Sequence, residues 1–477
     1  MTSRITQAQP PLEFIDPDFS PLVLRLGRSL LPFWLRRRKS VVRIDVTQAE
    51  KLIDLFHQFQ AGNIRLLLAF RHPTTIDPLC MGQMVWNILP AIARRQGRPF
   101  RTQPHIQFIY DRGIPLWAGA AVGWLISKLG GTPIRRGSLD TAGLRSIRNL
   151  FVDGDFPIAA APEGGTNGHN EIVSPIEPGI AQFGFWCAED LEKAGRDEEV
   201  LIVPIGIQYR FVSAPWKTLE ELLSQLEAES GIVNNSETLQ TLATLENGKP
   251  PSLDQEKLLY QRLIGLGEHL LSQMETFYRK YYGQAIETYK PSEQSDPSRD
   301  AAATPELGMR LHALLDRAIA VAEQSLGIKP KGELSDRCRR IEQSAWDRIY
   351  RDDLKSAESL SPLERGLADL VAEEANLRLW HMRLVETFVS VTGKYVAEHP
   401  TVDRFADTTL LIWKMLRQIR RHSASQPPDL GDRYAEITIA DPISISQQLP
   451  DYRHQRRRAI AQVTQELQAA LEAAITS

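Results

Sequence analysis

The chain has 477 residues, a formal net charge of -3 and only three cysteines, Cys80, Cys187 and Cys338. This length exceeds one ordinary domain, and the nearly balanced charge gives no global reason to expect a nucleic-acid partner. Three widely spaced cysteines indicate neither a disulfide framework nor a metal site, so we expect a reducing, cytoplasmic setting and no metal.

The first 45 residues form an N-terminal segment that either contacts a membrane surface or covers the core. This segment begins without the apolar stretch of a signal peptide. Residues 22–35 are rich in leucine and include Phe33 and Trp34, and the cluster Arg36-Arg37-Arg38-Lys39 follows. Aromatic rings beside cations suit peripheral binding to anionic headgroups. Pro32 argues against one continuous helix here.

Between residues 61 and 208, short apolar strands alternate with helical stretches. Strands are expected at 64–70, 105–110, 132–136, 156–161 and 200–207. Helices are expected between them at 81–95, 138–152 and 179–194. This alternation is typical of an α/β fold, with a largely parallel twisted sheet and flanking helices on both faces.

Residues 114–129 form the most apolar stretch of this region. The stretch is shorter than the roughly 20 residues that a bilayer requires, and it contains Lys128. We therefore expect a buried helix of the core here instead of a membrane span.

The segment that follows the first expected strand, Arg71-His72-Pro73-Thr74-Thr75-Ile76-Asp77, carries the strongest chemical signal. Open α/β sheets bind their ligands at the carboxyl ends of strands. His72 and Asp77 would not share a helix face, but a turn between them would let the carboxylate reach the ring. A carboxylate on one ring nitrogen leaves the other nitrogen free to accept a proton. The alternative is a structural histidine beside an unrelated aspartate.

Three further blocks follow in order: Gly130-Gly131-Thr132-Pro133-Ile134-Arg135-Arg136, Ala161-Pro162-Glu163-Gly164-Gly165-Thr166 and Ile202-Val203-Pro204-Ile205-Gly206. With the His-x4-Asp of His72 and Asp77, they resemble the four motifs of the glycerolipid acyltransferases, the family of glycerol-3-phosphate and lysophosphatidic acid acyltransferases. Those motifs read His-x4-Asp, Gly-Gly-x-Pro-x-x-Arg, Pro-Glu-Gly-Thr and Val-Pro. Each block stands beside an expected strand.

The resemblance implies an O-acyltransferase of glycerophospholipid synthesis. A fatty acyl group would move from acyl-CoA or acyl carrier protein to a hydroxyl of glycerol-3-phosphate or lysophosphatidic acid, with no further cofactor. His72 would be the general base and Asp77 would hold its ring. Because the acceptor hydroxyl attacks directly, Cys80 is expected to be a packing residue and not a nucleophile.

The resemblance also implies a set of substrate-binding residues. Arg136 would hold the acceptor's phosphate, because a guanidinium can grip two phosphate oxygens at once. Glu163, Gly164 and Gly165 would line the substrate site, where glycines bring backbone N–H groups close to an anion. Arg71, which stands where the family usually has asparagine, would add a cation near the phosphate.

The third block departs from the family's pattern. It contains an extra glycine, and Asn167 stands where the family has arginine. One phosphate ligand would then be missing, or supplied by Arg71 or by the helical insertion expected at 215–430. This departure weakens the assignment of a glycerol-phosphate acceptor more than that of acyl transfer itself. His169 is expected to be a histidine on a loop surface.

The rest of the chain divides into a helical stretch and a closing strand with a helix. Long helices are expected at 219–229, 255–282, 307–327, 363–395 and 404–421, and a strand at 434–443 precedes a helix at 456–473. We infer four parts: an N-terminal segment (1–45), the acyltransferase core (46–214), a helical insertion (215–430) and the end of the core (431–477).

Other functions remain compatible with the pattern. The chain could be a non-catalytic lipid-binding or scaffold protein with a vestigial site, an acyltransferase for a non-phosphate acceptor, or a thioester hydrolase. No Gly-x-Ser-x-Gly elbow supports a serine hydrolase.

Overall fold

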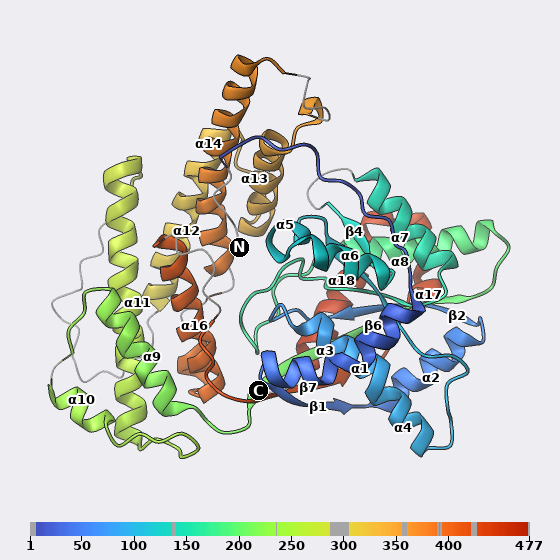
Figure 1. The fold of residues 1–477 in the computed structure, drawn as a ribbon, viewed down its shortest axis with the longest axis horizontal. Coiled ribbons are helices and arrows are strands. Elements are labelled where there is room, and N and C mark those ends of the chain that lie inside the picture. Colours follow the sequence, from blue (N-terminus) through green and yellow to red (C-terminus); the bar gives the residue numbers. More distant parts are fainter. Residues whose placement is uncertain are drawn as a thin grey trace. The chain divides into compact units, whose positions relative to one another are not determined.

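The computed structural model describes residues 6–135, 140–234, 236–286, 305–354, 360–388, 391, 394–420 and 427–475. The chain divides into two compact units (Figure 1). The α/β unit comprises residues 13–212 and 432–477, and the helical unit comprises residues 1–12 and 213–431. The expected insertion at 215–430 lies close to these divisions, whereas the expected N-terminal segment at 1–45 is split between the two units.

The α/β unit contains one mixed sheet. Its strands are β1 (Val41–Thr47), β2 (Ile64–Phe70), β3 (Gln107–Asp111), β4 (Thr132–Ile134), β5 (Ile158–Ala160), β6 (Glu199–Phe211), β7 (Arg433–Ile439) and β8 (Ile443–Ser444). Their order is β1-β7-β6-β2-β5-β3-β4, and β8 pairs with β6. The strands from β6 to β4 are parallel, whereas β7 and β8 run antiparallel to β6. The predicted α/β class with a largely parallel sheet is confirmed.

Helices cover both faces of this sheet. They are α1 (Pro21–Arg38), α2 (Ala49–Gln60), α3 (Asp77–Gln83), α4 (Leu89–Arg95), α5 (Ile114–Ala118), α6 (Ala120–Lys128), α7 (Thr141–Asp153), α8 (Gly179–Lys193), α17 (Ile445–His454) and α18 (Arg456–Ala473). A π-helical turn, Met84–Ile88, joins α3 to α4. None of the helices in the described part of the chain is long and apolar enough to cross a membrane.

The central position of β2 explains why residues 66–70 are apolar without interruption. Alternate side chains of a strand point to opposite faces. Leu66, Leu68 and Phe70 pack in the core under α1 to α4, and Leu67 and Ala69 pack in the core under α7, α8, α17 and α18. Both faces of β2 are therefore buried, as expected for a central strand covered by helices.

Two sequence-based expectations at the surface of this unit are wrong. The α1 helix continues through Pro32 without a break. Residues 114–129 form two helices separated at Gly119, whose φ of +96° suits glycine, and not one buried helix. Trp124 on α6 is 56% exposed.

One edge of the sheet was missed altogether. The pairing of β1 with β7 was not predicted, although residues 42–47 alternate between apolar and polar side chains. This alternation is the signal that could have identified β1.

The helical unit contains the long helices that the sequence predicts. Those are α9 (Trp216–Glu229), α11 (Leu253–Tyr282), α12 (Pro305–Leu326), α14 (Pro362–Phe388) and α16 (Val402–Ile419). The unit also contains α10 (Ser236–Leu242), α13 (Leu334–Ile349) and α15 (Tyr395–Glu398), which were not predicted. Buried arginines link several of them: Arg262 of α11 binds Glu220 and Glu227 of α9. Removal of one partner would leave a buried charge without compensation, which is costly. These pairs therefore fix which faces of the helices pack together.

A buried histidine ties the second sequence block to the helices before it. His105 Nδ1 accepts a hydrogen bond from Trp86 Nε1 at 3.0 Å, and its Nε2 lies 2.9 Å from the Leu129 carbonyl oxygen. These partners require the neutral ring with its proton on Nε2. Burial lowers the pKa of His105 from 6.5 to about 4, and the bond to Leu129 opposes the shift.

This histidine should make stability fall in acid. Because its pKa is lower in the folded chain than in the unfolded chain, the unfolded chain binds more protons between pH 6.5 and 4. We expect the stability advantage of the wild type over His105→Gln to shrink by about 3 kcal/mol at most from pH 7 to pH 4. Urea denaturation of both proteins across this range measures the difference, and a constant difference would contradict the prediction.

Candidate active site

The site begins where β2 ends. His72 Nδ1 lies 2.9 Å from Asp77 Oδ2. Asp77 is the first residue of α3, and the turn between β2 and α3 brings its carboxylate back to the ring, which is the contact that the sequence predicts. The side chain of His72 is 19% exposed, whereas that of Asp77 is fully buried. The buried carboxylate therefore holds the ring through Nδ1 while Nε2 is left for a ligand.

Asp77 is held by more than the histidine. Its Oδ2 accepts a hydrogen bond from the Thr74 backbone N–H at 2.8 Å, and its Oδ1 accepts from Thr74 Oγ1 at 2.9 Å. Tyr209 of β6 donates its hydroxyl to Oδ1 at 2.5 Å. A buried carboxylate with this many donors is fixed in position and compensated for its loss of water.

Tyr209 was not among the residues singled out from the sequence. Its side chain is fully buried, and burial, followed by the nearby Asp77, raises its pKa well above the ordinary value. It therefore acts as a hydrogen-bond donor to Asp77. Tyr209 lies five residues after Pro204 in β6. Its hydroxyl reaches Asp77 only because β6 pairs with β2. Cys80 lies 3.4 Å from the same hydroxyl in the core, and burial raises the pKa of its thiol to about 12.

Glu163 connects the end of β5 to the end of β2. Its Oε1 accepts a hydrogen bond from the His72 backbone N–H at 2.8 Å, and its Oε2 accepts from Asn167 Nδ2 at 3.1 Å and from the Ser174 backbone N–H at 2.9 Å. Burial raises the pKa of Glu163, while the nearby Arg71 and these backbone donors lower it. Both carboxylate oxygens are engaged within the protein, so Glu163 holds two loops together instead of offering an oxygen to substrate.

Arg71 does not lie where the sequence placed it. Its side chain is 0% exposed, and its guanidinium donates to the carbonyl oxygens of His169, Asn170 and Ile172 and to that of Ile207 at 3.2 Å. A guanidinium presents several N–H groups in one plane, which suits a cluster of carbonyls. The expected role of Arg71 in binding a phosphate is replaced by that of holding the loop at 169–172 against β6.

The loop of the third block folds inward. Gly164 has a φ of +73°, and its N–H donates to the Ala161 carbonyl at 3.2 Å, so this N–H closes a turn and does not face outward. Gly165 beside it is half-buried. His169 is 1% exposed and not a surface residue, and burial lowers its pKa to about 4. The loop is therefore packed on the chain that carries His72.

The second block is organised by a buried aspartate that sequence reasoning missed. Asp140 accepts hydrogen bonds from the Arg135 backbone N–H at 2.7 Å and the Gly143 backbone N–H at 3.0 Å, and it pairs with Arg112. It thereby caps α7, as an Asp immediately before a helix commonly does. Arg136, the expected phosphate ligand, lies outside the described residues.

The fourth block lies within β6 and contributes no polar side chain to the pair of His72 and Asp77. Val203 is opposite Leu68 and Pro204 is opposite Ala69 in the parallel pairing of β6 with β2. Both residues are buried. This block therefore shapes the strand beside His72.

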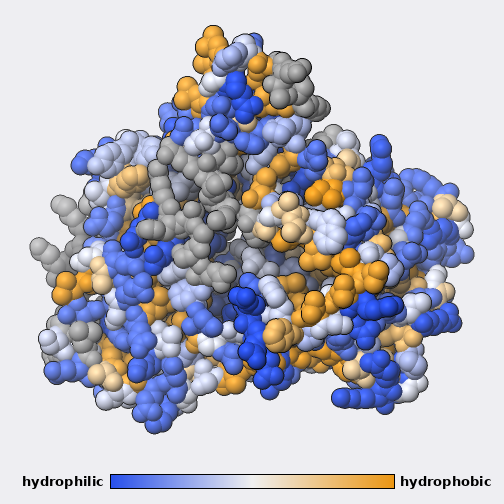
Figure 2. Space-filling view, viewed as in Figure 1, coloured by the Kyte–Doolittle hydropathy of each residue, from blue (hydrophilic) through white to orange (hydrophobic). Residues whose placement is uncertain are grey.

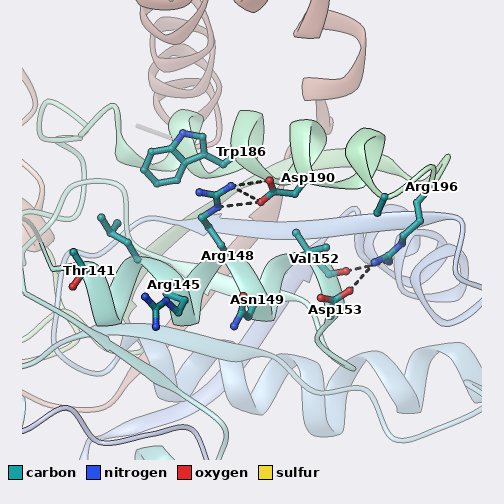
Figure 3. Close-up of a pocket in the computed structure, with 11 residues that line it drawn as sticks. Thr141, Arg145, Arg148, Asn149, Val152, Asp153, Trp186, Asp190 and Arg196 are labelled. Atoms are coloured by element: carbon teal, nitrogen blue, oxygen red, sulfur yellow. Dashed lines mark hydrogen bonds and ion pairs between the residues drawn. The ribbon is translucent and has the colours of Figure 1, made fainter.

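A groove of about 600 Å³ lies between α7 and α8 (Figure 3), and His72 is not among the residues that line it. Arg148 makes a two-pronged contact with Asp190, with nitrogen–oxygen distances of 2.7 and 3.0 Å, and lies over the ring of Trp186. Arg196 pairs with Asp153 at 2.7 Å. The charges of Arg148 and Arg196 are thus compensated by neighbouring carboxylates, which gives these two arginines a structural role.

This chain matches no known protein-family model and no curated protein sequence.

The hydroxyl of Tyr209 should contribute to stability through Asp77. Tyr209→Phe removes one donor from a buried carboxylate, and we expect the free energy of unfolding to fall by about 1.5–3 kcal/mol. Urea denaturation measures the change. Tyr434→Phe on β7 is the matched control: that side chain is only half-buried and lies beneath Arg43, so little change is expected. A Tyr209 variant as stable as this control would refute the role assigned to the hydroxyl.

Proposed function

We propose that the chain is an O-acyltransferase that moves a fatty acyl group from acyl-CoA or acyl carrier protein to a hydroxyl of glycerol-3-phosphate or lysophosphatidic acid. The observation that carries the proposal is the contact between His72 and Asp77 at the carboxyl end of β2, where His72 Nδ1 lies 2.9 Å from Asp77 Oδ2. The resemblance of four ordered sequence blocks to the glycerolipid acyltransferases supports the same reaction, and we propose the fold of that family for the α/β unit.

His72 acts as the general base. Its Nε2 takes the proton of the acceptor hydroxyl as the oxygen attacks the thioester carbonyl carbon, and Asp77 stabilises the resulting imidazolium through Nδ1. The tetrahedral intermediate then collapses, the carbon–sulfur bond breaks, and the thiolate takes the proton from His72. The products are the ester and the free thiol, so no protein nucleophile is required.

The surroundings of the pair suit a base that must keep one orientation. Asp77 is anchored by Thr74 and Tyr209, and the backbone of His72 is anchored by Glu163. Such support holds a catalytic ring within a narrow range of positions. The three cysteines are buried and unpaired, in keeping with a reducing, cytoplasmic setting for the reaction.

Removal of the imidazole should abolish transfer. We expect His72→Ala to lower kcat by a factor on the order of 1,000 or more, because general-base catalysis and its positioning are lost together. The assay supplies labelled acyl-CoA or acyl carrier protein with each acceptor in turn. His57→Ala on α2, away from the site, is the matched control and should retain the wild-type rate.

A His72 variant with a near-normal rate and an unchanged thermal midpoint would eliminate this mechanism. Release of free fatty acid without ester formation would identify a hydrolase. Thioester binding without turnover in the wild type would favour a lipid-binding protein.

Arg136 should act on the acceptor. If its guanidinium grips the phosphate, Arg136→Ala should raise the acceptor KM by about 10- to 100-fold while kcat changes little. Steady-state kinetics with varied acceptor test this, and Arg135→Ala provides the neighbouring control. An unchanged KM for the Arg136 variant would remove it from phosphate binding.

A further inference from the structure

The outward face of α1 is apolar although it is exposed to solvent. Leu22, Leu26, Leu30 and Phe33 recur at helical spacing and are 59–66% exposed, and Trp34 is 39% exposed beside them. The opposite face of the helix supplies Leu24, Leu31 and Leu35 to the core. The outward apolar residues of α1 therefore lie outside the core that anchors the helix, and such exposed apolar patches mark interaction surfaces.

The neighbouring α6 helix also carries exposed apolar side chains. Trp124 and Leu125 are 56% and 40% exposed. The chain that leads into α1 is bonded to the last turn of α6, because the Ser20 N–H donates to the Lys128 carbonyl at 2.8 Å and the Asp18 N–H donates to the Ser127 carbonyl at 2.9 Å. Figure 2 shows apolar side chains on the face where α1 and α6 lie in Figure 1. We call the exposed apolar residues of α1 and α6 the α1–α6 face.

The charges on α1 have one sign, whereas at its junction with α6 the exposed Asp18 pairs with Lys128. Residues 21–39 include six cations, Arg25, Arg28, Arg36, Arg37, Arg38 and Lys39, and no acidic residue. Arg37 lies over the ring of Phe33 at 5.5 Å and Lys39 over that of Trp34 at 5.2 Å. These cations therefore border the exposed rings, an arrangement in which rings can enter an interface while cations meet anionic headgroups.

A second exposed apolar stripe in the chain has the opposite charge and provides a comparison. Leu363, Leu367 and Leu370 on α14 are 55–73% exposed. Residues 362–374 contain four acidic residues, Glu364, Asp369, Glu373 and Glu374, and one cation, Arg365. Exposure of leucine is thus shared by the two stripes, but only α1 combines it with aromatic rings and an excess of positive charge.

We propose that the α1–α6 face binds the surface of an anionic lipid bilayer, with its leucines and aromatic rings in the interface and Arg36, Arg37 and Arg38 on the headgroups. The α1 helix packs against α3, whose first residue is Asp77. Binding through this face would therefore hold the helix layer that carries the candidate site against the membrane. The inference rests on the surface alone and holds whether or not the chain transfers acyl groups.

The test is co-sedimentation of the full chain with vesicles of phosphatidylcholine containing about one-third phosphatidylglycerol, at low and high salt. The wild type should bind these vesicles more tightly than pure phosphatidylcholine vesicles, and salt should weaken binding because it screens the cations. Arg36→Gln/Arg37→Gln/Arg38→Gln should lower the partition coefficient on the order of 100-fold at low salt, at about fivefold for each cation. Leu26→Gln/Leu30→Gln/Phe33→Gln and Trp124→Gln/Leu125→Gln should each lower it at least about tenfold.

The matched control is Leu363→Gln/Leu367→Gln/Leu370→Gln on α14, which should bind as the wild type does. Thermal midpoints should stay close to the wild type for all variants, because the altered side chains are exposed. No binding by the wild type, or equal binding by the α1 variants, would overturn the proposal. An equal loss of vesicle binding in the α14 control would also overturn the proposal. A dimer that dissociates in the α1 variant, with unchanged vesicle binding, would identify the face as a contact between copies and overturn it as well.

Discussion

The candidate site depends on how the loops after two neighbouring strands are held together. Because β2 and β5 are parallel, their carboxyl ends meet at one edge of the sheet, but nothing in the pairing itself orders the loops beyond it. Arg71, which follows β2, and Glu163, which follows β5, hold these loops in place. The guanidinium of Arg71 binds carbonyls of the 169–172 loop, and the carboxylate of Glu163 binds backbone N–H groups of both loops. Both groups are buried, where an unsatisfied charge would be costly, so the two loops have one low-energy arrangement.

This arrangement leaves His72 as the accessible member of a buried polar network. Asp77, Glu163 and Tyr209 are each buried and hydrogen-bonded, whereas His72 is partly exposed. A rigid support with one open group is what a general base requires, because its orientation must not depend on the ligand. A histidine that only packs against Phe70 would not require these hydrogen bonds to Asp77 and to its own backbone.

The α1–α6 face follows from a different constraint. A helix at the edge of a domain normally presents its apolar stripe to the core and polar residues to water. The α1 helix is apolar on both sides, and its outward side is bordered by cations without a compensating acid in residues 21–39. The acidic α14 stripe shows that exposed leucines alone do not distinguish the two surfaces. Charge and aromatic rings do, and they direct α1 toward anionic lipid.

Local sequence determined most of the α/β architecture and the identity of the central pair. Three local patterns limit the backbone directly: the apolar run of residues 66–70 in β2, the alternation of strands with helices, and the five-residue spacing of His72 and Asp77. The long helices of residues 215–430 are equally readable. What local patterns could not supply was the partner of each polar side chain. Arg71 reads as an exposed cation and His169 as a surface histidine until loop 169–172 folds over β6.

Tertiary structure alone decided the remaining features, because they join residues far apart in the chain. Tyr209 reaches Asp77 only through the pairing of β6 with β2, and Asp140 pairs with Arg112, which lies 28 residues earlier in the chain. The exposure of residues 114–129 depends on a break at Gly119 and on which helix face finds a neighbour. Composition records how apolar such a stretch is, but only packing determines whether that apolar surface is buried or left for a partner.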